Sequence, residues 1–77
     1  MSIVPIVSIA RMVAVLLAAG FKVLRQKGSH RFFQHPITKK VTMVAIHPGD
    51  LNRTAIKTIL KQAGISVDEF LRFIRKK

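Results

Sequence analysis

The chain lacks cysteine, tryptophan and tyrosine altogether, and it has only three acidic residues among its 77. Without cysteine it has no disulfide framework, no thiolate nucleophile and no cysteine-based zinc site. The acidic residues are Asp50, Asp68 and Glu69. They are too few to supply the converging carboxylates that hold the ions of a two-metal nuclease. Any chemistry on an anionic polymer must therefore proceed without a carboxylate-bound metal, and we expect no cofactor.

Positive charge is what the sequence has in excess. Fourteen Lys and Arg residues give a net charge of +11, and six of these cations fall within residues 22–40, where no acidic residue offsets them. This balance predicts an anionic partner, either nucleic acid or an acidic surface. The hydrophobic fraction is 49%, which is enough for one modest core at this length. No linker or repeat divides the chain, so residues 1–77 are predicted to form a single domain.

The apolar stretch over residues 3–21 raises the question of an export signal or a membrane span. An export signal begins with positive residues, but nothing before Arg11 is charged. A span would place Arg11 at mid-depth in the bilayer, which is costly, and Pro5 would shorten the helix. Ser8 as an N-cap and Gly20 as a stop instead predict a short amphipathic helix. We expect no membrane partner.

The outward face of this helix is less polar than a solvent-facing surface usually is. It is predicted to carry Arg11, Ala14, Val15 and Ala18. Alanine is a strong helix former, which by itself accounts for part of this composition. The other interpretation is that the face contacts a second protein chain, with Val15 and Ala18 as the candidate contact residues. The sequence leaves both interpretations open.

Three short β-rich segments follow, and each is stopped by a turn signal. The turn signals are Gly28-Ser29, Pro36 and Pro48-Gly49. The predicted strands are Phe21–Lys27, His30–His35 and Val41–Ile46. Because the connections between consecutive strands are short, we expect an antiparallel meander.

Two more helices complete the predicted fold. Apolar residues at helical spacing predict the first over Arg53–Ala63, and Ser66 with Glu69 forms a capping box that begins the second. The apolar residues expected to be buried on the last helix are Phe70, Leu71 and Ile74. The order α-β-β-β-α-α, with helices on one face of a three-stranded antiparallel sheet, is an α+β layer fold. In outline it is close to a double-stranded-RNA-binding domain.

The three histidines do not form an obvious metal site. His30 and His35 lie five positions apart in one predicted strand, and an odd offset places them on opposite faces of the sheet. His47 lies in a later segment, and no cysteine or spare acid completes a ligand set. Zinc binding is therefore not expected.

His30 differs from the other two in its neighbours. It follows Gly28-Ser29 and lies between Lys27 and Arg31. An imidazole can move a proton to or from the ribose 2′-oxygen or the leaving 5′-oxygen of RNA, while cations stabilise charge on the phosphorus centre. The alternative interpretation is that His30 is one more polar residue on a sheet that binds nucleic acid and has no catalytic role. A single histidine does not distinguish a catalytic residue from such a surface residue.

Two segments carry a resemblance to a known family. Residues 20–30 read Gly-Phe-Lys-Val-Leu-Arg-Gln-Lys-Gly-Ser-His, followed by Phe33 and His35-Pro36. The second half contains His-Pro-Gly-Asp-Leu at residues 47–51 and Ile-Leu-Lys-Gln-Ala-Gly-Ile-Ser at residues 59–66. Together these segments resemble the HicA toxins, the messenger-RNA interferases of HicA–HicB toxin–antitoxin pairs. The resemblance covers nearly the whole chain.

The resemblance implies a fold like a double-stranded-RNA-binding domain and ribosome-independent cleavage of mRNA in the cytoplasm. It also implies inhibition by a HicB-like antitoxin that covers the active site. The histidine of Gly-Ser-His, here His30, would be the catalytic residue. The candidate RNA-binding residues are Arg25, Lys27, Gly28, Ser29, Arg31, Lys39 and Lys40.

Two other functions remain to be weighed against the enzyme. The first is a non-catalytic RNA-binding module that uses the same basic sheet through shape and phosphate contacts. The second is a membrane-surface peptide, suggested by the charge and the apolar helix. The capping box, the hairpin signals and the distributed core argue against the second, since a surface peptide needs none of them. Composition cannot choose between the enzyme and the binding module, whereas the Gly-Ser-His match favours the enzyme.

Overall fold

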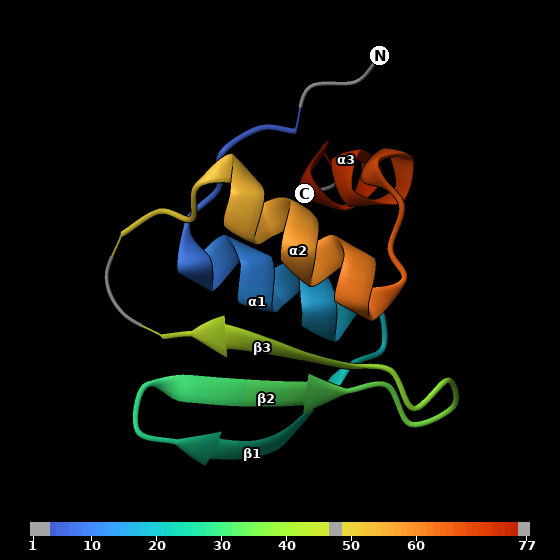
Figure 1. The fold of residues 1–77 in the computed structure, drawn as a ribbon. Helices are drawn as coiled ribbons and strands as arrows, with labels where there is room; N and C mark the ends of the chain where they lie inside the picture. Colours follow the sequence, from blue (N-terminus) through green and yellow to red (C-terminus); the bar gives the residue numbers. More distant parts are fainter. Residues whose placement is uncertain (1–3, 47–48, 76–77) are drawn as a thin grey trace.

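The computed structural model describes residues 4–46 and 49–75 and has three helices and a three-stranded sheet (Figure 1). The elements are α1 (Ile9–Ala18), β1 (Lys22–Lys27), β2 (His30–Gln34), β3 (Val41–Ala45), α2 (Arg53–Ala63) and α3 (Val67–Arg75). Both strand pairs are antiparallel and the sheet order is β1-β2-β3. The predicted α+β fold is confirmed. Each predicted strand is one residue too long, at the ends where assignments ordinarily vary.

The helices gather on the β3 side of the sheet, and β1 forms the far edge (Figure 1). Both α1 and α2 contact β3, while α3 packs against α1. The buried face of the sheet carries Phe33, Thr42 and Val44, each almost completely inaccessible to solvent. In contrast, every residue of β1 is exposed. The core therefore lies between the helices and the β2–β3 pair.

The two ends of α1 form as the sequence predicts. The hydroxyl oxygen of Ser8 accepts a hydrogen bond from the backbone N–H of Arg11 at 3.1 Å. At the other end Gly20 has a φ of 101°, and the N–H groups of Gly20 and Phe21 donate to the carbonyls of Leu17 and Leu16. This is a Schellman C-cap, whose left-handed residue favours glycine. The chain then turns directly into β1.

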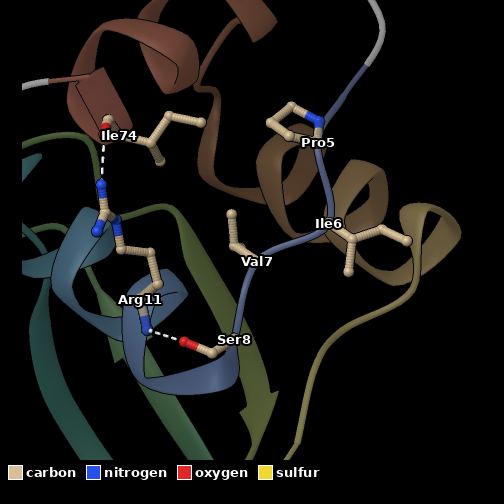
Figure 2. A pocket seen from close by; sticks show the side chains of 6 residues that line it. All are labelled: Pro5, Ile6, Val7, Ser8, Arg11 and Ile74. Carbon is tan, nitrogen blue, oxygen red and sulfur yellow. Dashed lines mark hydrogen bonds between the residues drawn. The ribbon is translucent and has the colours of Figure 1, made fainter.

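The outer face of α1 differs from the sequence-based expectation. Val15 is only 3% exposed and belongs to the core, so its assignment to a contact with another chain is wrong. The reason is α3, which packs against α1 and adds a second layer that the helical pattern alone does not reveal. Figure 2 shows the Arg11 guanidinium donating a hydrogen bond to the carbonyl oxygen of Ile74 in α3. Ala18 is exposed.

The capping box of α3 is present in both directions. The backbone N–H of Ser66 donates to Glu69 at 3.1 Å, and the N–H of Glu69 donates to the hydroxyl oxygen of Ser66 at 3.1 Å. Phe70 is completely buried, whereas Leu71 and Ile74 are only half-buried. Burial was expected for all three residues; it is complete for Phe70 and partial for Leu71 and Ile74, and Ile74 still packs against the core.

Within residues 4–46 and 49–75, no helix has the length and apolar character needed to cross a membrane.

Replacement of Val15 by Glu should unfold the protein. A carboxylate placed in this buried position loses its hydration, at a cost of several kcal/mol, against a total stability of about 5–15 kcal/mol. The matched control is Ala14→Glu, at the neighbouring exposed position. Circular dichroism melting should show a cooperative transition for the control and none for Val15→Glu. A folded Val15→Glu protein would contradict the placement of Val15 in the core.

The capping box should make the folding stability of the protein depend on pH in the acidic range. The backbone N–H of Ser66 hydrogen-bonds the Glu69 carboxylate and, with the Ser66 side chain and the charge of Arg72, lowers the pKa of Glu69 below its ordinary value of 4.5. A lowered pKa in the folded state contributes stability above the unfolded pKa, and this contribution is lost as the pH falls through the folded pKa.

The melting temperature of the parent should therefore fall more steeply in acid than that of Glu69→Gln. Asp68→Asn is the control, because it removes the same charge from the same helical turn. Melting curves recorded from neutral pH to below pH 4.5 test this expectation. Equal acid dependence in the parent and Glu69→Gln would show that the box contributes nothing through its charge.

Candidate nucleic-acid interface

The β1–β2 hairpin presents His30. Lys27 ends β1, Gly28-Ser29 form the turn, and His30 begins β2, with Lys27 and His30 directly paired. Gly28 has a φ of 59°. A glycine at the first central position is typical of tight hairpin turns, whose twist matches that of the strands. The backbone N–H of Ile46 donates to the carbonyl oxygen of Ser29 at 2.6 Å, which ties the turn to the segment after β3.

Cross-strand pairing decides which side chains accompany His30. Residues directly opposite each other in an antiparallel ladder share a face of the sheet. His30 pairs with Lys27 on one side and with Ala45 on the other. In the next row Phe32 pairs with Arg25 and with Met43. We call the face that carries these two rows the open face; it is opposite the buried face of Phe33, Thr42 and Val44.

The open face combines an imidazole, two cations and an aromatic ring. His30, Arg25 and Lys27 are all exposed, and Phe32 is half-buried. The Arg25 guanidinium carbon lies 5.0 Å from the centroid of the Phe32 ring, a cation–π contact that orients the arginine. A phosphodiester at His30 would therefore meet positive charge from β1 on the same face.

Arg31 lies on the other face, although it follows His30 in sequence. It pairs with Gln26 and with the buried Val44. Its Nε donates to the Gln26 side-chain oxygen at 3.0 Å, and the Gln26 amide nitrogen donates to the carbonyl of Gly28 at 3.0 Å. Arg31 thus braces the hairpin turn behind His30. Side chains alternate between the two faces along a strand. The sequence alone could therefore have placed His30 and Arg31 on opposite faces, as it did His30 and His35.

Lys39 and Lys40 lie at the opposite end of the sheet from His30. They belong to the turn between β2 and β3, and β2 spans five residues, roughly 13 Å at about 3.3 Å per residue. Lys39 has a positive φ of 64°. The stem of Lys40 packs over Gly64, where an added Cβ would lie 2.9 Å from the Lys40 Cδ. The predicted RNA-binding residues therefore do not form one cluster, because Arg31 lies on the opposite face and Lys39 and Lys40 lie at the far end of the sheet.

His35 has a packing role. Its ring meets Phe21 edge to face, with centroids 5.4 Å apart, and its Nδ1 accepts hydrogen bonds from the backbone N–H groups of Ile37 and Thr38 at 3.1 and 3.3 Å. It lies just past the end of β2 rather than within the strand. His47 lies outside the described residues. Within residues 4–46 and 49–75, no group of three His, Cys, Asp or Glu side chains could hold a metal ion.

A hollow of about 280 Å³ between β3 and α2 adds to this surface, and sequence reasoning missed it. It is lined by Met43, Ala45, Leu51, Ala55, Thr58, Ile59 and Gln62. Ala45 is the residue paired with His30. The helical residues recur at the spacing of one helix face, which was the available signal. A second hollow of about 400 Å³ lies between the N-terminal segment, α1 and α3 (Figure 2), away from the open face.

The sequence model of one protein family, the HicA toxins of bacterial toxin–antitoxin systems, matches residues 9–65 of this chain. The match covers well over half of the chain. The chain belongs to the HicA toxin family. The matched segment runs from the start of α1 to just after α2 and includes the hairpin that presents His30. Members of this family are toxins that pair with HicB antitoxins, and the match supports a toxin role for this chain. No curated protein matches the sequence.

Proposed function

We propose that this protein is a metal-independent endoribonuclease that cleaves mRNA and uses His30 as the acid–base group. The family is known for mRNA cleavage. The observation that carries the proposal is the position of His30, exposed at the hairpin end of the open face and directly paired with Lys27. Geometry comes first for a general base, and an exposed imidazole at a strand end is accessible to a bound polymer.

The proposed reaction is a transesterification within the RNA. The ribose 2′-hydroxyl loses its proton, its oxygen bonds to phosphorus, the bond from phosphorus to the 5′-oxygen breaks, and the 5′-oxygen takes up a proton. The products are a 2′,3′-cyclic phosphate and a 5′-hydroxyl end. His30 moves these protons, while Lys27 and Arg25 stabilise the negative charge that builds up on the phosphoryl oxygens.

The second candidate is an RNA-binding module without catalysis. The same open face supports it, because Arg25 stacked on Phe32 and the neighbouring cations would bind a single strand through phosphate contacts and stacking. The two candidates differ only in what His30 does. They are therefore separated by the fate of the RNA and not by its affinity.

A HicB antitoxin that covers the open face would block both the cations and His30 at once. Because the chain carries a net charge of +11, the antitoxin surface that fits it is acidic. The cytoplasm, where mRNA is translated, is the expected compartment.

Replacement of His30 by Ala should abolish cleavage and leave RNA binding nearly intact. Loss of general acid–base catalysis costs roughly 10²–10⁴-fold in rate, whereas loss of one hydrogen bond to RNA costs only about 0.5–1.5 kcal/mol. Gel analysis of purified protein with single-stranded RNA measures the cleavage rate, and filter binding measures the affinity. His47→Ala serves as the histidine control and should retain most activity.

Two further arms of this assay test the reaction itself. EDTA should not slow the parent, and RNA with 2′-deoxyribose at the cleaved position should resist cleavage, because attack requires the 2′-oxygen. Cleavage by His30→Ala at the parental rate, or dependence on added divalent metal, would refute the mechanism. The open face would then be assigned to binding alone.

The affinity for single-stranded RNA should fall steeply with salt, at about −0.7 in log–log slope per phosphate contacted. Two matched double variants locate these contacts: Arg25→Gln with Lys27→Gln removes two charges near His30, and Lys39→Gln with Lys40→Gln removes two at the far end. Each should make the slope shallower by about 1.4 in total. Only the first pair should also slow cleavage at saturating RNA. A flat salt response of the parent would mean that the cations serve solubility alone.

A further inference from the structure

The hollow between β3 and α2, which we call the β3–α2 groove, opens beside the proposed catalytic position. Ala45 lines it and is the direct cross-strand partner of His30, and Met43 lines it and is the partner of Phe32. Neighbouring strands lie about 4.8 Å apart. A nucleotide whose phosphate rests at His30 therefore has the groove one strand away, on the same face of the sheet.

The groove is neutral, in contrast to the rest of this surface. Among the residues that the structure describes, those that line the groove, named above, include no Lys, Arg, Asp or Glu, and most of them are apolar. A phosphate would find no countercharge among these side chains. The part of a nucleotide that fits such a lining is the flat, neutral base, which packs well against apolar and thioether side chains.

Two polar side chains on α2 add hydrogen-bonding groups of fixed direction. The Gln62 side-chain oxygen accepts a hydrogen bond from the buried Thr42 hydroxyl at 2.9 Å. Within residues 4–46 and 49–75 the Gln62 amide N–H groups have no acceptor, so they can donate to a ligand. The Thr58 hydroxyl donates to the carbonyl of Thr54 at 2.9 Å, so its oxygen can still accept. Fixed donors and acceptors around an apolar floor give a site its selectivity.

We propose that the β3–α2 groove binds one nucleobase of the RNA next to the phosphodiester at His30, and that Gln62 selects which base enters. The Gln62 amide donates to an acceptor on the base edge, and Met43 packs against the base. Phosphate contacts from Arg25 and Lys27 bring the polymer to the open face without reading its sequence. The groove supplies the sequence preference. This assignment rests on the proposed function, since it requires RNA on the open face.

The test compares binding of four homo-oligonucleotides of RNA, one for each base and all of equal length. Because they carry the same number of phosphates, differences among their affinities report contacts with the bases. The measurements are made with His30→Ala protein, in which the RNA stays intact. We expect this protein to prefer one base over the weakest by at least about tenfold, the effect of one good base contact.

Two changes in that background alter the groove. Gln62→Glu keeps an oxygen for Thr42 and replaces the amide donor by an acceptor. Ala55 is half-buried and lines the groove, so the larger side chain of Ala55→Phe fills the groove. The control for charge is Lys57→Gln, which lowers the net charge by one, as Gln62→Glu does, and which does not line the groove.

The expected result is that Gln62→Glu changes the preferred base, Ala55→Phe removes most of the preference, and Lys57→Gln weakens all four oligonucleotides equally. An unchanged preference in both groove variants, with cooperative melting retained, overturns the assignment. If Ala55→Phe, made in the protein with His30 intact, prevents the HicB antitoxin from inhibiting RNA cleavage and leaves the base preference unchanged, the groove is a protein contact and the assignment is equally overturned.

Failure of the proposed function gives a different pattern. If the protein with His30 intact leaves all RNA uncleaved while the groove variants still change base preference, the enzyme proposal fails and the nucleobase site stands on binding alone. If cleavage depends on His30 and its preferred site on mixed-sequence RNA is the same in the parent, Gln62→Glu and Ala55→Phe, the enzyme stands and the groove does not read bases.

Discussion

The pairing register of β2 is the constraint on which this structure depends. A slip of one residue would turn every side chain of the strand to the opposite face. Phe33 is completely buried, and burial of such a side chain is worth about 1.5–3 kcal/mol, which a slipped strand would lose. The same register that holds Phe33 against the helices holds His30 and Phe32 on the open face. The hydrophobic core thereby determines which side chains the open face presents.

The exposed strand β1 shows how one set of residues serves two needs. An edge strand with open backbone groups invites pairing with other chains, and natural proteins discourage this with charge and bulges. β1 has both, because the register shifts between Val23 and Arg25 and the strand carries three cations. Two of these cations, Arg25 and Lys27, are the ones that the proposed function directs to phosphate. In that proposal, protection of the edge and attraction of RNA come from the same side chains.

The fold could be predicted from the sequence because its signals are local. Ser8 and Gly20 bound the first helix, Gly28-Ser29 fixes the hairpin, and the capping box begins the last helix. What could not be predicted depends on contacts between distant elements. The helical pattern of residues 9–18 cannot show that α3 packs against α1, so the burial of Val15 was missed. Similarly, the groove beside His30 requires α2 to lie along β3, a position that neither segment specifies alone.

The link between core and site is clearest at Thr42. It is the one polar side chain found fully buried among the described residues, and a buried hydroxyl without a partner would cost about 1–3 kcal/mol. Its partner is the side chain of Gln62, so the requirement of the core holds Gln62 beside β3, where it lines the groove. The position of a side chain at the surface is therefore set by a buried polar atom. A site held in this way is preorganised, because the stability of the fold already maintains the geometry that binding needs.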